Sequence, residues 1–230
     1  MEELYKKTLD RLKAELKKQL PEIEANGDWL WHHPEAGFKE TETQKYCLEV
    51  LKNHGFEACT WPDVTGFTCT YDTGRPGPCV MIMGEMDSLI CYSHPDCNPE
   101  TGAAHACGHS IQVATAMGAF ITLTESGVLE NFGGKVMLAG VPAEECLEIE
   151  WRTREIQKGR LHYLCGKAEL LYRGAFDVVD IVISMHAGLG NDGTITTASS
   201  PKMSHSRDDP PTRQRIRKTG STPCTWQTRL

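Results

Sequence analysis

Three short apolar runs constrain the fold of this 230-residue chain more than any other feature. They cover residues 80–83 (VMIM), 135–141 (KVMLAGV) and 178–185 (VVDIVISM). Continuous apolar runs of this length are typical of strands that are covered on both faces of a sheet. Segments with helical spacing separate the runs, and this alternation predicts an α/β fold with a mainly parallel mixed sheet flanked by helices.

Apolar residues at helical spacing predict the helices that flank this sheet. Near the N-terminus, leucines recur at helical spacing among lysines, and we expect Pro21 to end that helix before a second helical stretch that reaches His33. Further helices are expected over residues 41–53, 111–123, 147–158 and 167–172. The helix at 111–123 is rich in alanine and apolar residues, which predicts that it is buried.

Polar side chains follow each apolar run at its C-terminal end. Carboxylates follow the first two runs, an imidazole follows the third, and a Cys-Gly-His sequence begins the buried helix: Glu85 and Asp87, Glu144 and Glu145, His186, and Cys107 with His109. Taken singly, each is more typical of an incidental pair, a solvated helix start or a hydrogen-bonded loop residue. Together they lie where an open α/β sheet collects its ligands. Thiolate, imidazole and carboxylate groups converging there predict a divalent-metal site.

The composition is that of an ordinary globular protein, with 40% hydrophobic and 24% charged residues. A formal net charge of -7 argues against a general nucleic-acid-binding or anionic-membrane surface. The charged N-terminus lacks the apolar centre of a signal peptide, and no apolar run approaches the roughly 18 residues of a membrane span. The ten cysteines are scattered along the chain, which favours free thiols in a reducing compartment. We therefore expect a cytoplasmic protein.

Five segments of the sequence resemble the M20 metallopeptidases. They are HHPEAGFKETET (32–43), GEMDSL (84–89), HACGHS (105–110), GVPAEE (140–145) and SMHAG (184–188). They are most similar to the amidohydrolase branch, which includes N-acyl-amino-acid and aminobenzoyl-glutamate hydrolases, and the similarity runs from residue 1 to about residue 198. The resemblance implies cleavage of an amide bond in an N-acyl amino acid or dipeptide-like substrate by metal-activated water. It also implies two divalent cations in an α/β catalytic domain, and an inserted lid domain through which the family forms homodimers.

The resemblance assigns roles to the polar residues at the strand ends. The family's metal ligands correspond to Cys107, His109, Glu145 and His186. Glu144 corresponds to the catalytic general base and Asp87 to the acidic residue that supports the metal site, whereas Glu85 receives no role. Ser110 stands where the branch commonly has Asp or Asn, a change that we expect to tune the site rather than remove it. The donor set favours zinc, and its carboxylates keep manganese open.

The sequence changes character near residue 200, becoming dense in Arg, Pro, Ser and Thr without apolar periodicity. We expect residues 1–198 to form the N-terminal part of an M20-like catalytic domain and residues 199–230 to form an irregular tail. In another reading frame, codons for residues 219–227 can encode Gly-Ile-Asn-Ala-Leu, which resembles the family's lid helix. We therefore interpret the tail as a frameshifted start of the lid and dimerisation domain. A natural disordered basic tail is the alternative.

Three classes of function remain open at this point. The first is a metal-dependent amidohydrolase acting on a small amide, with no nucleic-acid or membrane partner. This chain would be truncated and weakly active or inactive, because the family has a further C-terminal ligand and a lid. The second is a non-catalytic metal-binding fragment. The third is a hydrolase with a Cys107 nucleophile and His109 as its base, but such enzymes normally bring the histidine from elsewhere in the chain.

Overall fold

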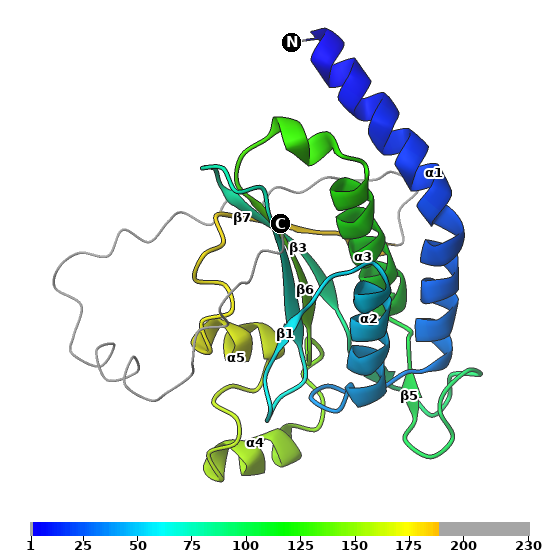
Figure 1. Cartoon of the computed structure of the whole chain (residues 1–230). Helices are drawn as coiled ribbons and strands as arrows, with labels where there is room; N and C mark the ends of the chain where they lie inside the picture. The colour runs from blue at the N-terminus through cyan, green and yellow to red at the C-terminus, as the bar shows by residue number, and fades with distance from the viewer. Residues whose placement is uncertain (1, 189–230) are drawn as a thin grey trace, which may run out of the picture. The chain divides into compact units, whose positions relative to one another are not determined.

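A five-stranded sheet in the order β1-β2-β6-β3-β7 organises the chain (Figure 1). The computed structural model describes residues 2–188, and every structural statement below concerns these residues. β3 (Cys79–Glu85) pairs in parallel with β6 (Lys135–Val141) and β7 (Ile181–Ser184). β2 (Phe67–Asp72) pairs antiparallel with β6 and with β1 (Cys59–Thr60). The predicted mixed α/β sheet is confirmed, and the three apolar runs of the sequence form its three parallel strands.

Helices cover the sheet on both sides. They are α1 (Glu2–His32), α2 (Thr41–Asn53), α3 (His109–Glu125), α4 (Ile149–Gln157), α5 (Gly166–Tyr172) and a short 3-10 helix over Val128–Asn131. In Figure 1, α1, α2 and α3 lie on one side of the sheet and α4 and α5 on the other. A separate two-stranded hairpin, β4 (Leu89–Ile90) with β5 (Ala103–Ala104), follows β3 and was not predicted.

Alternate side chains of the two central strands enter different cores, as the two-residue period of a strand requires. Ile82 of β3 and Leu138 of β6 belong to the larger apolar cluster beneath α1, α2 and α3. Met81 and Met137 belong to the second cluster, which also contains Leu170 of α5. Both faces of these strands are therefore covered, and this explains why their sequences are apolar almost without interruption.

The first helix corrects the prediction that Pro21 would end it. α1 runs from Glu2 to His32 with Pro21 inside it. Proline removes one backbone hydrogen bond within a helix, but Pro21 and Lys17, whose carbonyl loses that bond, are both exposed and can be solvated. The helix also buries Asn26 and Leu30 beyond the proline, so packing on the domain continues across it. Tertiary packing therefore overrides the local signal.

The third apolar run forms a shorter and more exposed strand than predicted. β7 covers residues 181–184 rather than 178–185, and it pairs with β3 alone at the edge of the described sheet. Ile181, Val182 and Ile183 are 49%, 52% and 50% exposed. The run is apolar on both faces like its two neighbours, but within residues 2–188 its side chains are only half covered.

The remaining sequence expectations meet the structure in part. Among residues 2–188, no helix combines the length and apolarity that crossing a bilayer requires. Eight cysteines in this range are free thiols, as expected, but Cys59 is disulfide-bonded and the expectation fails there. The predicted boundary at residue 198 and the tail over 199–230 lie outside the described residues.

Candidate metal centre

Three adjacent parallel strands bring the predicted site residues together. β6, β3 and β7 are neighbours in the sheet, and their C-terminal ends lead into Glu144–Glu145, Glu85–Asp87 and His186 respectively. Since parallel strands end at the same edge of a sheet, these side chains meet in one place. The convergence that the sequence predicted is therefore present.

Gly108 lets the Cys-Gly-His sequence face this edge. It precedes α3 with a φ of 94°, in the left-handed region that favours glycine. A Cβ atom at Gly108 would lie 2.8 Å from the Cβ of Ala187, which follows β7. Glycine at this position therefore allows both the turn between Cys107 and His109 and the close approach of the β7 end.

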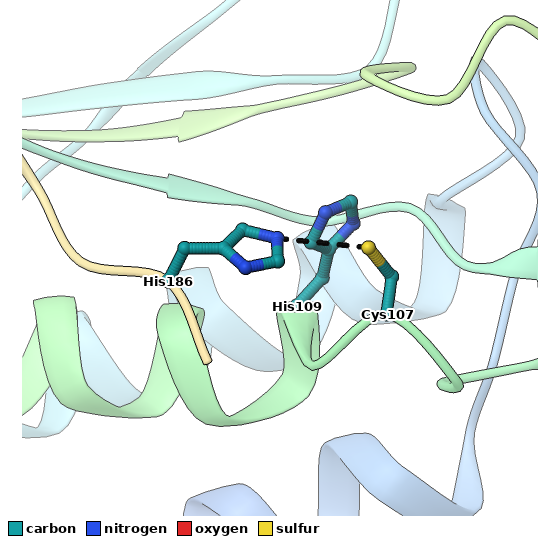
Figure 2. A group of neighbouring side chains, drawn as sticks. All are labelled: Cys107, His109 and His186. Carbon is teal, nitrogen blue, oxygen red and sulfur yellow. Dashed lines mark hydrogen bonds between the residues drawn. The ribbon is translucent and has the colours of Figure 1, made fainter. Parts of the chain in front are cut away.

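Cys107, His109 and His186 form one group of potential metal ligands, hereafter the thiol–imidazole side. One donor atom from each lies within 4.8 Å of the other two. Figure 2 shows the three side chains pointing toward one another, with a contact of 3.6 Å between the Cys107 Sγ and the His186 Nε2. The two imidazole rings are perpendicular, with centroids 5.4 Å apart. Three of the four predicted ligands therefore converge.

The orientation of His109 leaves one nitrogen available to a metal ion. Its Nδ1 donates to the backbone carbonyl of Asp87 at 2.9 Å, which assigns the proton to that nitrogen. Its Nε2 is buried and makes no hydrogen bond, although the Glu85 Oε2 lies 3.2 Å away. That distance suits an ion pair but the two groups are not aligned for a hydrogen bond. A histidine held through one nitrogen, with the other free, is the usual arrangement of a metal ligand.

Protons occupy the thiol–imidazole side in the metal-free chain. Burial, followed by the neighbouring Glu145 carboxylate, raises the pKa of the Cys107 thiol to about 11. Burial would lower the pKa of His109, but its contacts with Asp87 and Glu85 outweigh burial and raise that pKa to about 10. Negative charge therefore surrounds both groups, and a divalent cation would relieve the same excess of charge that now holds these protons.

Glu85, His109 and Glu144 form a second group of potential ligands, hereafter the carboxylate side. Their donor atoms also lie within 4.8 Å of one another. Lys167 of α5 forms an ion pair with the Glu85 Oε1 and lies 3.5 Å from the Glu144 Oε1. Burial would raise the pKa of Glu85, but His109 and Lys167 outweigh it and lower that pKa to about 2. The carboxylate side thus contains a cation supplied by the chain itself.

Asp87 connects the two sides. Its side chain is fully buried, one carboxylate oxygen accepts a hydrogen bond from the Glu145 backbone N–H at 2.8 Å, and the other lies 3.3 Å from the His109 Nδ1. The carboxylate of Glu145 lies beside Cys107, where it raises the pKa of the thiol. Glu145 is outside both ligand groups among the described residues, whereas Glu85, to which sequence reasoning assigned no role, is in one of them.

Sequence reasoning missed two residues that support the site. Glu40 is fully buried, and its carboxylate accepts hydrogen bonds from the Thr65 hydroxyl at 2.5 Å and the Ala143 backbone N–H at 2.8 Å. Burial raises the pKa of Glu40 to about 8. Ala143 has a φ of 50° and directly precedes Glu144, so Glu40 holds a strained residue next to the carboxylate side. Lys167 was missed because only the folded chain brings α5 to β3.

Gln112 of α3 links two of the converging strands. Its side-chain carbonyl accepts a hydrogen bond from the Glu85 backbone N–H at 3.2 Å, and its amide donates to the Ser184 hydroxyl at 2.9 Å. The glutamine is buried in an otherwise apolar helix face, and its polar atoms are satisfied by β3 and β7. It therefore fixes the end of the edge strand that carries His186.

Comparison with known proteins agrees with this geometry. No family model matches the chain. It is 26% identical over 183 residues to an N-acyl-L-amino acid amidohydrolase of Geobacillus stearothermophilus, covering 76% of this chain and 44% of the relative. It is 31% identical over 160 residues to a p-aminobenzoyl-glutamate hydrolase of Escherichia coli, covering 63% of this chain and 31% of that protein. The chain thus spans less than half the length of these relatives.

Solved structures agree on the fold. The YxeP protein of Bacillus subtilis, described as a dinuclear metal binding peptidase from the M20 family, matches 76% of this chain and 44% of its own. The TM-score is 0.58 at 24% sequence identity. Amidohydrolases and peptidases among the sequence relatives, together with the M20 fold, agree with the resemblance seen in the motifs. The chain belongs to the M20 family of metal-dependent peptidases and amidohydrolases.

Proposed function

We propose that this chain is the metal-binding part of a hydrolase that cleaves the amide bond of an N-acyl amino acid or dipeptide-like substrate. The observation that carries the proposal is the convergence of Cys107, His109 and His186 donor atoms within 4.8 Å. The names of the relatives, an N-acyl-L-amino acid amidohydrolase and a p-aminobenzoyl-glutamate hydrolase, support an amide as the substrate. We extend the proposal to a cytoplasmic location and to a family-type homodimer.

The donor set fits a pair of divalent cations. Cys107, His109, Glu145 and His186 are the proposed ligands, and the carboxylate side offers further oxygen donors. Thiolate and imidazole suit zinc, and the carboxylates also suit manganese. When bound, such cations supply Lewis acidity that polarises a carbonyl and lowers the pKa of water. The unpartnered Nε2 of His109 is the structural feature that fits this requirement most directly.

Glu144 is the proposed general base. Its side chain is 36% exposed, so it can reach a water molecule while its neighbour Glu145 remains beside Cys107. The carboxylate takes a proton from the attacking water and returns it to the leaving amine. Lys167, 3.5 Å away, pairs with the ionised carboxylate that this role requires. Asp87 positions His109 and the Glu145 backbone for the same event.

Elemental analysis and calorimetry of the purified chain test the metal site. We expect zinc to be retained after desalting, and Cys107→Ser or His186→Ala to abolish retention. Cys91→Ser removes a thiol outside both ligand groups and is the matched control. A chain that binds no divalent metal, or a Cys107→Ser variant that binds it equally well, would contradict the proposal.

An activity assay separates catalysis from binding. In a full-length relative, Glu→Gln at the position matching Glu144 should keep metal binding and lower turnover on the order of 10³-fold, as expected for loss of a general base. Equal loss of metal and activity would make Glu144 a ligand instead. For this chain we expect weak or absent hydrolysis of N-acyl amino acids, and robust metal-dependent release of an amino acid would overturn that expectation.

A non-catalytic metal-binding fragment is the second candidate. The observation that favours it is coverage, because the chain spans 44% and 31% of the two relatives described above. Zinc binding without hydrolysis would support it. Activity that resists chelators would instead support a Cys107 nucleophile. For the segment after residue 198, we keep the proposal of a frameshifted start of the lid domain, which the nucleotide sequence of the gene would test.

A further inference from the structure

Cys146 and Cys165 form a thiol pair outside the two ligand groups. Their Sγ atoms lie 3.1 Å apart, although 19 positions separate them in the sequence. Cys146 is exposed and Cys165 is partly exposed, so reagents in solution can reach the pair. The other free thiols differ: Cys91 contacts a serine hydroxyl, and Cys107 contacts an imidazole.

The backbone holds the two cysteines together independently of their thiols. The Gly166 N–H donates to the Ala143 carbonyl at 3.0 Å. A Cβ atom at Gly166 would collide with the carbonyl oxygen of Pro142, so the start of α5 lies directly against the segment that follows β6. The sulfur atoms need to approach by about 1 Å to reach a bonding distance of about 2.05 Å. A bond between them therefore requires little movement of either segment.

We propose that Cys146 and Cys165 are a redox modification site that forms a reversible disulfide when the chain meets a low-molecular-weight disulfide such as oxidised glutathione. One cysteine sulfur attacks the reagent, forming a mixed disulfide and releasing one reduced thiol. The second cysteine attacks the protein sulfur of that mixed disulfide and releases the second thiol. The protein pair loses two electrons and two protons, and the reagent gains both as its two thiols.

The position of the pair gives the modification a consequence. Cys146 directly follows Glu144 and Glu145, while Cys165 precedes the helix that carries Lys167. A disulfide would therefore fix the segment bearing the carboxylates against the helix bearing their ammonium partner. Formation of the bond does not depend on the proposed hydrolase. Only its effect on metal binding does, so the two ideas fail separately.

Peptide mapping of the full chain tests the proposal. The chain is incubated with oxidised glutathione and digested with trypsin under non-reducing conditions, and Arg152, Arg154 and Arg160 provide cleavage sites between the two cysteines. We expect one cross-linked species that contains Cys146 and Cys165, lighter than the two reduced peptides by two hydrogens and abolished by dithiothreitol. Cys91→Ser should leave it unchanged.

Single variants keep the test decisive. Cys146→Ser changes an exposed side chain, so the variant should fold, and its Cys165 should carry a glutathione adduct instead of the cross-link. The oxidised chain should also unfold at a higher urea concentration than the reduced chain, because the disulfide closes a loop in the unfolded state, and Cys146→Ser should lose this shift. Glutathione adducts on both cysteines of the unaltered chain, or a cross-link from Cys146 to Cys107, would overturn the proposal.

Discussion

The two sides of the metal centre share His109 but differ in the positive charge that occupies them. On the thiol–imidazole side, protons with raised pKa values sit on Cys107 and His109. On the carboxylate side, Lys167 neutralises Glu85 and approaches Glu144. An incoming cation must therefore displace protons on one side and a side-chain ammonium on the other. Binding to the first side should depend on pH, whereas binding to the second should depend on the position of α5.

Loss of a ligand on the thiol–imidazole side should have the largest effect. We expect Cys107→Ser or His186→Ala to weaken zinc binding by more than about 100-fold, which exceeds the effect of losing a residue that only supports a ligand. Titration calorimetry measures this directly. If Glu85→Gln weakened binding more than either variant, the carboxylate side would be the primary site and the comparison would be reversed.

The pH dependence of zinc binding should be the next largest effect. The pKa values of about 11 for Cys107 and about 10 for His109 lie above neutrality, so both groups are protonated in the metal-free chain at pH 7. Ligation requires deprotonated donors, and the apparent affinity should therefore rise with pH, about tenfold per unit for each proton released. Calorimetry in buffers of different ionisation enthalpy counts these protons. Cys107→Ser should release one fewer, and an unchanged count would exclude the thiol as a ligand.

Removal of the ammonium on the carboxylate side should have a smaller and opposite effect. Lys167→Met leaves Glu85 and Glu144 without their cation, so divalent-metal binding should tighten by up to about tenfold. The metal-free chain should lose about 1–3 kcal/mol of unfolding free energy, because the carboxylate of Glu85 is buried but Lys167 itself is partly solvated. Lys167→Arg keeps the charge and is the control. Weaker metal binding in Lys167→Met would show that the lysine supports the cation rather than competing with it.

Glu40 should have the smallest effect on metal binding. Its pKa of about 8 makes it mostly protonated at pH 7, so Glu40→Gln should change zinc affinity little there. The folded pKa lies above the ordinary value of 4.5, so the folded chain binds more protons, and the unfolding free energy falls as pH rises from about 5 to 8. Glu40→Gln should remove this part of the slope in urea titrations. An unchanged slope would show that the carboxylate is already ionised at neutral pH.

The strands that build the site could be predicted because their signal lies within single segments. The run at 135–141 matches β6 residue for residue, and the residue types after each run correctly indicated where the side chains meet. Pro21 misled because helix packing is decided by contacts with α3 that a local pattern does not contain. Lys167 and Glu40 escaped notice for the same reason, since a lysine in a short helix and a glutamate before a helix acquire their roles only through partners distant in the sequence.

The edge position of β7 bears on how fast a bound ion could leave. His186 is the one donor of its group carried by a strand that pairs on a single side within residues 2–188. Edge strands open at a lower free energy than strands inside a sheet, and the Gln112–Ser184 hydrogen bond is the side-chain link that opposes this opening. Release of the ion should therefore follow local fraying of β7 rather than unfolding of the whole chain. The lifetime of the complex would be a property of this strand, while the selectivity for the ion remains a property of the helix start at Cys107 and His109.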